Sequence, residues 1–357
     1  MTSKDRVERT LNHQEADRVP RAESFWPETI PQWLEQGMPE GLDLAATFGY
    51  DICGAGWLNH EARIGFQRVV DETPEWITRE DGHGAVLRYW KGKSGTPEHI
   101  AFTVSDRKSW DVHKAALLRA PIAARVSAAN VLREMERARA AGLWFCWSGL
   151  ECFEMAKDIL GHEGLCYAMA EDPDWAADVY ATLANLAVSA LDHLEQSGAR
   201  FDGAWIYGDI AYNHGPFCSP AMYRRCVQPA QKKQIAWFHE RGLKVIYHTD
   251  GDFRPLLPAF VETGMDCLQP LEAKAGIDVR ALKPEWGNRF SFMGNIDATV
   301  LLTNDRDRIE AEVSSKIPLA KQGGGYLYHS DHSIPPGVTW DSYRFLMERV
   351  DAHGRFG

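Results

Sequence analysis

The chain has 357 residues, of which 45% are hydrophobic and 25% charged, so it can bury a large core and a disordered or fibrous protein is excluded. A formal net charge of −11 disfavours nucleic acid and an anionic membrane surface as partners. The sequence has no apolar run of membrane-spanning length, no signal-peptide pattern, and seven cysteines without Cys-x-x-Cys spacing. We therefore expect a cytoplasmic protein with reduced thiols.

Eight short runs rich in β-branched or aromatic residues are predicted to be strands, and stretches with helical period separate most of them. The runs cover residues 19–24, 50–55, 143–147, 203–207, 243–247, 266–269, 290–293 and 326–329. The clearest helical stretches cover residues 173–197, 220–241, 252–263 and 305–322. Alternating strands and helices favour a parallel sheet, so the expected fold is α/β, a (β/α)₈ TIM barrel, with a doubly wound open sheet as the alternative.

Residues 61–104 interrupt this alternation. The stretch 84–90 and the Gly-Lys-Ser-Gly turn at 92–95 are typical of antiparallel strands, which we predict to be a lid or side wall inserted after the second strand. Residues 121–140 are predicted to be a charged helix that leads into the third strand. No internal repeat or long Gly/Ser-rich linker divides the sequence, so we expect a single domain over residues 1–357.

In a barrel of this kind the catalytic groups lie at the carboxyl ends of the strands, and here those positions are polar. The polar residues that follow the third and later runs are Ser148, Glu151, Glu154, Asp209, His248, Thr249, Asp250, Gln269, Glu272, Asn295, Asp297, His329, Asp331 and His332. Any one of them is also an ordinary helix cap or turn residue. The functional prediction therefore depends on several of them meeting at one mouth.

Two of these positions indicate a metal site. His248 and Asp250 form a His-x-Asp pair directly after a strand, which places both side chains on the same side of its exit. His329 and His332 form a second dense cluster, and either one would complete a site with three ligands. Three protein ligands with an open fourth position are typical of a catalytic Zn²⁺.

Some of the 13 tryptophans are candidates for the wall of a pocket that takes a flat ligand. Trp144 and Trp205 lie inside predicted strands, so we assign them to core packing. Trp26 and Trp147 are predicted to bind substrate, together with Tyr207.

Several ordered motifs then point to a known family. They are residues 6–20 (RVERTLNHQEADRVP), Asp202-Gly203 with Asp209, residues 215–216 with 219–223, and the segments 248–251, 264–272, 294–297 and 323–335. This set, which covers nearly the whole chain, resembles proteins of the uroporphyrinogen decarboxylase-like superfamily. The resemblance implies a (β/α)₈ barrel.

The resemblance also bears on the reaction. The true decarboxylase carries an Arg-rich segment for the carboxylates of its porphyrinogen, whereas residues 21–28 here offer one Arg and two acids, so that activity is not expected. The other large branch comprises methyltransferases that use a corrinoid protein and often Zn²⁺ held by His-x-Cys and a later Cys. His248 matches the histidine of that pattern, and Asp250 and His332 replace the two cysteines. This harder ligand set favours an oxygen- or nitrogen-centred methyl compound, such as a methoxy compound or a pterin, over a thiol.

The leading hypothesis is thus a zinc-assisted methyltransferase that moves a methyl group between a small O- or N-methylated compound or a pterin and a corrinoid supplied by a partner protein. Asp209 or Glu151 would act as general acid, with His329 as a further catalytic group. Gln269 and Asn295 would orient the ligand by hydrogen bonds.

Two other functions remain open at this point. One is a decarboxylase or other lyase that acts on a small carboxylic acid without a corrinoid, and the other is a barrel that binds a planar ligand without catalysis. The sequence does not decide between His329 and His332 as the metal ligand, and it is compatible with a homodimer.

Overall fold

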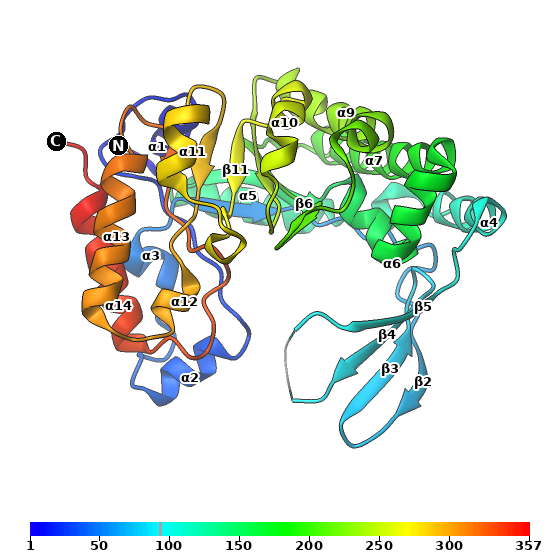
Figure 1. Cartoon of the computed structure of the whole chain (residues 1–357), viewed down its shortest axis with the longest axis horizontal. Coiled ribbons are helices and arrows are strands. Elements are labelled where there is room, and N and C mark those ends of the chain that lie inside the picture. The colour runs from blue at the N-terminus through cyan, green and yellow to red at the C-terminus, as the bar shows by residue number, and fades with distance from the viewer. Residues whose placement is uncertain (93–94) are drawn as a thin grey trace.

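Seven parallel strands form the central sheet of a computed structural model that describes residues 1–92 and 95–357 (Figure 1). They are β1 (Ile52–Ala55), β6 (Trp144–Leu150), β7 (Gly203–Tyr207), β10 (Lys244–His248), β11 (Cys267–Gln269), β12 (Ser291–Met293) and β13 (Tyr326–Leu327), adjacent in this order. These strands fall in the last seven of the eight predicted runs, so the prediction of an α/β protein with a parallel sheet is confirmed.

The first predicted strand, residues 19–24, is an extended segment with a single parallel bridge, between Arg21 and Tyr328. It is hydrogen-bonded on both sides, because Pro20 O accepts from Tyr328 N at 2.8 Å and Arg21 O accepts from Asp51 N at 2.7 Å. The segment therefore lies between the two edge strands, β13 and β1. Pro20 has no N–H to donate, which shortens the ladder that this segment can form.

Helices lie between successive strands of the sheet, as the alternating pattern predicts. They are α1 (Ser3–Leu11), α2 (Thr29–Glu35), α3 (Leu44–Phe48), α4 (Arg107–Leu117), α5 (Ala128–Ala140), α6 (Cys152–Glu171), α7 (Pro173–Gln196), α8 (Pro220–Met222), α9 (Gln228–His239), α10 (Leu257–Thr263), α11 (Val279–Trp286), α12 (Ala298–Leu301), α13 (Arg306–Ala320) and α14 (Trp340–Gly354). A π-helical turn at Tyr223–Val227 joins α8 to α9, and 3₁₀ turns lie at Ile122–Ala124, Arg254–Leu256 and Ala273–Ala275. Among the described residues, no helix is both long enough and apolar enough to span a bilayer.

The two faces of the sheet are buried in two different apolar clusters. Alternate residues of β6 point to opposite faces, so Trp144 and Cys146 face the interior of the barrel while Phe145 and Trp147 face the surrounding helices. The inner cluster also contains Ile246, Cys267, Met293, Leu327 and, from α1, Val7 and Leu11. Because Thr10 O accepts from Gly325 N just before β13, α1 covers the amino-terminal end of the strands. Their carboxyl ends are left to form the site.

Residues 61–104, which were predicted to contain inserted antiparallel strands, contain a four-stranded antiparallel sheet. Its strands are β2 (Arg68–Glu72), β3 (Trp76–Glu80), β4 (Ala85–Trp90) and β5 (Glu98–Phe102), paired in that order. In Figure 1 this sheet projects from one side of the barrel below α6. The turn predicted at 92–95 includes residues 93 and 94, which lie outside the described residues. A two-stranded ribbon, β8 (Ala211–Tyr212) and β9 (Gly215–Pro216), follows β7.

One buried carboxylate holds the seam between the first and last strands together. Asp51, immediately before β1, is fully buried and accepts hydrogen bonds from Arg6 Nη1 at 2.5 Å, Arg18 Nη1 at 2.7 Å and Arg21 N at 2.7 Å. It thereby joins α1, the extended segment and β1. Removing one member of a buried ion group leaves the others charged and unpaired, which typically costs about 3–5 kcal/mol.

We therefore expect Asp51→Asn to lower the free energy of unfolding by about 3 kcal/mol or more, measured by denaturant titration. The matched control is Asp17→Asn, because Asp17 pairs with the same Arg6 but is 45% exposed. Solvent screens that pair, so its loss should change the free energy of unfolding by less than about 1 kcal/mol. Equal effects of the two substitutions would contradict the assignment of Asp51 to the seam.

Candidate functional site

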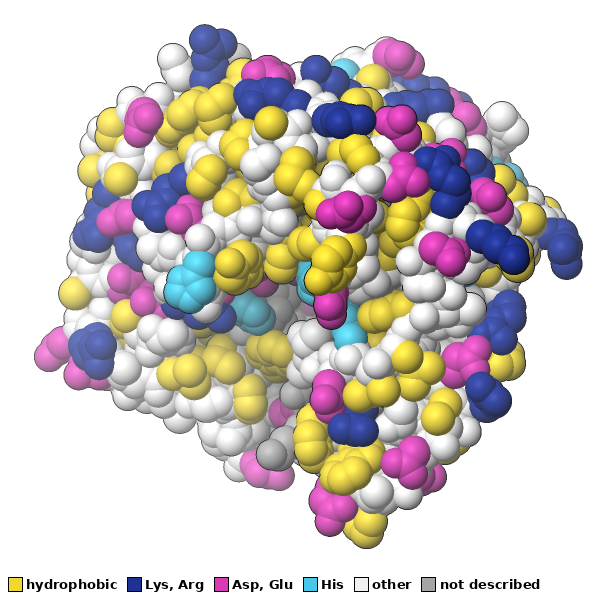
Figure 2. Space-filling model, turned by 45° about the vertical axis from the view of Figure 1, so that its right-hand side comes forward, with side chains coloured by type: hydrophobic (Ala, Val, Ile, Leu, Met, Phe, Trp, Pro, Cys, Tyr) yellow, Lys and Arg dark blue, Asp and Glu magenta, His cyan; other side chains and the backbone are white. Residues whose placement is uncertain are grey.

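A cavity of about 290 Å³ lies at the carboxyl ends of the strands. It is lined by Ser24, Trp205, Tyr207, His248, Asp250, Gln269, Pro270, His329, His332 and Ser333. Six of these residues were predicted from the sequence to act at the site: Tyr207, His248, Asp250, Gln269, His329 and His332. Figure 2 shows a hollowed face of the molecule with histidine side chains gathered around the hollow.

His248 is the centre of the polar cluster. Its Nε2 atom lies 3.4 Å from Asp209 Oδ1 and 3.9 Å from Asp250 Oδ1, while its Nδ1 atom is 2.6 Å from Gln269 Oε1. His332 Nε2 lies 3.9 Å from Asp250 Oδ2 on the other side. The structure therefore brings together the three predicted metal ligands, and it adds Asp209 to them.

The local backbone explains this convergence. His248 is the last residue of β10, and Asp209 follows the end of the neighbouring strand β7 by two residues. Asp250 N donates to Asp209 Oδ1 at 3.0 Å, which ties the two loops to each other. One ligand atom each from Asp209, His248 and Asp250 lies within 4.8 Å of the others, and Asp250 Oδ1 is buried without a hydrogen-bond partner. This arrangement fits a cation bound between the side chains.

The charges of this cluster decide where its proton resides. Burial by itself would lower the pKa of His248, but the hydrogen bond and negative charge of Asp209, followed by the charge of Asp250, raise it to about 9. Burial likewise opposes the ionisation of Asp209, yet its hydrogen bond to His248 lowers the pKa of Asp209 to about 2. At neutral pH the pair is thus an imidazolium and a carboxylate.

His329 has a different environment. It is 2% exposed, its Nδ1 atom is 2.6 Å from Ser330 O, and its Nε2 atom is buried without a hydrogen-bond partner. Burial lowers the pKa of His329 to about 4, so it is a neutral imidazole at pH 7. Its ring contacts the ring of Trp205 edge-on, with centroids 5.7 Å apart.

Sequence reasoning missed Glu23, a fully buried carboxyl group beside this histidine. Glu23 Oε1 lies 3.6 Å from His329 Nδ1, and Glu23 accepts hydrogen bonds from Ser330 Oγ at 2.6 Å and Tyr328 OH at 2.8 Å. Burial raises the pKa of Glu23 to about 7 in spite of these bonds. The available signal was its position near the end of the first predicted strand.

A second cavity of about 490 Å³ adjoins the first, and Asp250 lines both. Asp209 and Lys157 also line it. Lys157, another residue that sequence reasoning missed, forms an ion pair with Glu154 one turn earlier on α6, and Glu154 Oε2 accepts from Asp209 N at 3.2 Å. Burial raises the pKa of Glu154 to about 7. A carboxyl group whose pKa lies near neutrality is therefore hydrogen-bonded to the backbone of Asp209.

Four residues predicted for the site do not line either cavity: Glu151, Trp147, Asn295 and Trp26. Glu151, the expected alternative general acid, is fully buried as the N-cap of α6, where it accepts from Gln231 Nε2 at 2.9 Å. Trp147, expected to bind substrate, faces the helices and donates from Nε1 to Gly56 O at 3.1 Å. Both locations have one cause, because the side chains of Trp147 in β6 and of Glu151 just after it point toward the surrounding helices and away from the cavity.

Asn295, expected to orient the ligand, is the third of these residues. It is fully buried with a positive φ of 73°, and its side chain donates to Leu271 O and Ile277 O while accepting from Val279 N. Its amide therefore satisfies the backbone of the loop after β11 and is not free for a ligand.

The tryptophans were in part assigned to the wrong locations. Trp205, which was assigned to the core, lines the cavity and donates from Nε1 to Gln269 Oε1 at 3.1 Å. Trp26 stacks on His332, with ring centroids 5.8 Å apart and an angle of 5° between the planes. The cavity is thus bordered by aromatic rings, although not by the predicted Trp147.

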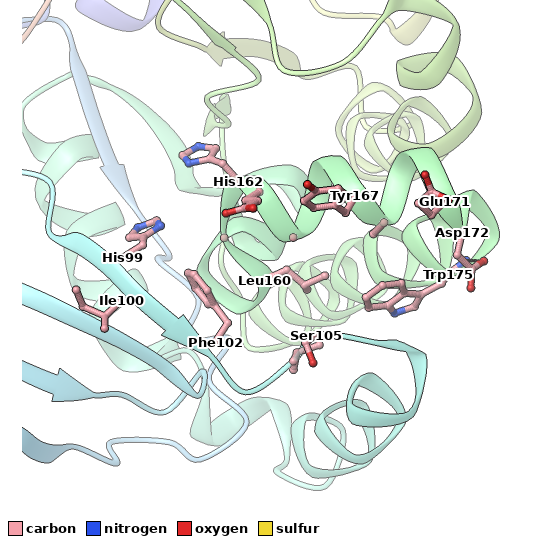
Figure 3. Close-up of a pocket in the computed structure, with 15 residues that line it drawn as sticks. His99, Ile100, Phe102, Ser105, Leu160, His162, Tyr167, Glu171, Asp172 and Trp175 are labelled. Carbon is pink, nitrogen blue, oxygen red and sulfur yellow. Dashed lines mark hydrogen bonds between the residues drawn. The ribbon is translucent and has the colours of Figure 1, made fainter.

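A larger cavity, of about 600 Å³, lies between β5 and α6 (Figure 3). Phe102, Leu160, Tyr167 and Trp175 give it a largely apolar wall, and it contains none of the residues predicted for the site. The backbone of α6 is non-helical at Gly161, where a Cβ atom would lie 2.4 Å from the ring of Phe102. A glycine is required there because the antiparallel sheet packs against this point of the helix.

Comparisons with known proteins identify the family. The sequence model described as Uroporphyrinogen decarboxylase (URO-D) matches residues 152–353, which is more than half of the chain. The chain therefore belongs to the uroporphyrinogen decarboxylase family, and the resemblance noted in the sequence is confirmed.

The proteins similar to this chain include a decarboxylase and a methyltransferase. A curated uroporphyrinogen decarboxylase from Saccharophagus degradans is 26% identical over 187 residues, which cover 51% of this chain and 49% of that protein, so the chain matches over about half of that relative's length. A solved structure of a methyltransferase from Methanosarcina mazei has a TM-score of 0.69 at 16% identity and covers 99% of both chains. The second likeness extends the shared fold over the whole chain.

The ion pair at the rim can be tested by titration. In metal-free Asp209→Asn protein the larger of the two carboxylate contributions that raise the pKa of His248 is gone and only that of Asp250 remains, so the pKa should fall clearly below 9. Nuclear magnetic resonance of the histidine ring protons measures this pKa directly. The control is Asp252→Asn, because Asp252 pairs with Arg254 away from His248. A His248 pKa that stays near 9 in Asp209→Asn would refute the assignment.

Proposed function

We propose that this chain is a methyltransferase that moves a methyl group between a small O- or N-methylated compound, or a pterin, and a corrinoid carried by a partner protein. The observation that carries the proposal is the cluster of His248, Asp209, Asp250 and His332 on the rim of a small, aromatic-walled cavity. Membership of the uroporphyrinogen decarboxylase family and the fold shared with a methyltransferase support it.

The cavity supports a small substrate over a porphyrinogen. Its volume is about 290 Å³, and none of the described residues that line it is Lys or Arg. Arg21, the single arginine of residues 21–28, is 6% exposed and forms an ion pair with Asp351 at 2.6 Å. It is therefore not available to neutralise a substrate with many carboxylates. Trp26, Trp205 and Tyr207 offer flat surfaces for an aromatic or heterocyclic methyl compound.

The residues at the rim fit a zinc ion. His248 Nε2 and the carboxylates of Asp209 and Asp250 are nitrogen and oxygen donors that suit zinc, and the buried Asp250 Oδ1 has no other partner. His332, next to Asp250, is the remaining candidate ligand from the predicted set. Gln269 accepts from His248 Nδ1 and thereby holds the ring so that Nε2 faces the carboxylates.

Bound zinc would act as a Lewis acid toward the oxygen or nitrogen that carries the methyl group, and the corrinoid would supply the nucleophile that takes it. Without metal, His248 Nε2 holds a proton at the same place. Both serve one chemical need, because an alkoxide or amide anion is a poor leaving group unless its new charge is neutralised. A zinc ion and the proton compete for Nε2, so metal loading would release a proton.

The geometry also changes the roles proposed from the sequence. Asp209 has a pKa of about 2 and is ionised at neutral pH, so we assign it to positioning His248 and not to proton donation. Glu154, with a pKa of about 7 and a hydrogen bond to Asp209 N, replaces Glu151 as the carboxyl group that can exchange protons near the rim. His329, neutral and with a free Nε2, is suited to contact the substrate heteroatom.

The activity is tested with a panel of methoxylated aromatic compounds, N-methylated compounds and a methylated pterin, with cob(I)alamin as acceptor. We expect methyl transfer by the wild-type protein and a fall in kcat/KM of about 100-fold or more in His248→Ala and Asp250→Ala. His239→Ala is the control, because this exposed histidine pairs with Asp266 before β11, at the opposite end of the barrel. Release of carbon dioxide from a small carboxylic acid, without methylation of cob(I)alamin, would instead favour a lyase.

The metal assignment has its own test. After zinc reconstitution, elemental analysis should find one zinc per chain fewer in His248→Ala than in the wild type, and zinc uptake should weaken as the pH falls because protons occupy Nε2. The His239→Ala control should keep the wild-type zinc content. An unchanged zinc content in His248→Ala would place the metal elsewhere or exclude it from the rim.

A further inference from the structure

A second group of metal-ligating side chains lies outside the site described above. His60 follows β1, His83 lies in the turn between β3 and β4, and Asp158 lies on α6. One ligand atom from each lies within 4.8 Å of the other two. The rings of His60 and His83 are 4.2 Å apart between centroids, and His60 Nε2 is 3.2 Å from Asp158 Oδ2.

The turn that carries His83 is built to point it at the barrel. Asp81 Oδ1 accepts from His83 N at 2.9 Å and from Ala85 N at 3.1 Å, which closes a tight turn. Gly84 has a φ of 80°, a conformation that suits glycine. Strands β3 and β4 therefore meet in a turn whose one histidine lies beside Asp158 of α6, and β5 contacts the same helix where Phe102 meets Gly161.

The position of His60 is fixed in the same way from the barrel side. Arg125, which is 3% exposed, donates from Nη1 to Asn59 O at 3.0 Å and to Glu61 O at 2.9 Å, on both sides of His60. The positive charge of Arg125 is thus used to hold backbone carbonyl groups. This preorganised loop places the imidazole of His60 without reliance on the inserted sheet.

Both histidines keep nitrogen atoms without hydrogen-bond partners. His60 is 5% exposed, and its Nε2 atom lies 3.2 Å from Asp158 Oδ2 without an aligned hydrogen bond. The buried Nδ1 atom of His83 also has no partner. A buried nitrogen without a hydrogen-bond partner is unfavourable, and these two imidazoles from different segments meet beside one carboxylate.

Access to this point is open. His60, His83 and Asp158 line a cavity of about 490 Å³, to which Trp57 and Glu154 also contribute. A metal ion bound by the three side chains would have its fourth coordination position open to this cavity. Burial lowers the pKa of His83 to about 3, so its nitrogen lone pair is available at neutral pH, as metal binding requires.

We propose that His60, His83 and Asp158 form a second divalent-metal site, suited by its two imidazoles and one carboxylate to zinc, which fastens the inserted sheet to the barrel. Two nitrogen ligands, one oxygen ligand and a water from the cavity complete the four positions that zinc prefers. The three ligands come from three segments that are far apart in the sequence, so the metal would act as a cross-link. This site is separate from the His248 cluster, and the proposal does not depend on the methyltransferase activity.

The test is a comparison of zinc stoichiometry in full-length proteins. Wild type, His83→Ala and the control His99→Ala are stripped with a chelator, reconstituted with Zn²⁺ and subjected to elemental analysis. His99 lies on β5 of the same inserted sheet but belongs to neither metal group. We expect His83→Ala to hold one zinc per chain fewer than wild type and His99→Ala. An identical zinc content in all three would overturn the proposal.

A second comparison separates this site from the rim. His248→Ala and the double variant His83→Ala, His248→Ala should also differ by one zinc per chain. If the rim binds no metal, wild type holds one zinc and His83→Ala holds none, which refutes the rim assignment and supports this one. If His83→Ala differs from wild type by no zinc while His248→Ala does, the rim site stands and the second site is refuted.

A physical readout covers the case in which a variant binds less zinc because it folds poorly. Zn²⁺ should slow proteolytic cleavage within residues 61–104 of the wild-type protein by about tenfold, because local opening of the sheet must first break the metal bonds. Asp158→Asn, which keeps the size of the side chain but weakens its binding to a cation, should lose this protection while retaining the wild-type circular dichroism spectrum. Protection of equal size in Asp158→Asn would count against the site.

Discussion

The hydrogen-bond register of three neighbouring strands determines the site. In the ladder that joins β7, β10 and β11, Tyr207, His248 and Gln269 are direct partners at the same level of the sheet. Parallel strands in register place equivalent side chains on the same face, so these three groups enter the cavity side by side. One layer below, Trp205 lines the cavity and is the ladder partner of Ile246, which belongs to the inner apolar cluster. The chemistry of the rim therefore depends on backbone bonds that involve none of its side chains.

The electrostatics of the rim follow from the imbalance between its groups. Two carboxylates, Asp209 and Asp250, face His248, so a positive charge is required among them, whether it is a proton or a metal ion. His329, which lines the same cavity from the loop after β13, is kept neutral by burial. The two imidazoles thus carry different charges at pH 7. His248 can neutralise a developing negative charge, whereas His329 can contact a neutral ligand.

Much of the fold and part of the site could be predicted from the sequence. Seven strands and the group His248, Asp250 and Gln269 were predictable because apolar runs with polar residues at their ends indicate which side chains reach a barrel mouth. Trp147 and Trp205 were misassigned because both faces of the strands are apolar, so the pattern does not reveal which residues face inward. The burial of Glu23 depends on side chains about 305 residues away in the sequence, and the amide of Asn295 is taken up by distant backbone carbonyls, so a local pattern does not reveal either environment.

Helix α6 connects the two parts of the molecule discussed above. Glu154 and Asp158 are four residues apart and lie on one face of it: Glu154 accepts from Asp209 N, and Asp158 lies beside His60 of the barrel and His83 of the inserted sheet. A helix is stiff along its axis, so Glu154 and Asp158 move together when α6 moves. A movement of the inserted sheet that displaced α6 would therefore also displace Glu154, whose side chain bonds to the backbone of Asp209.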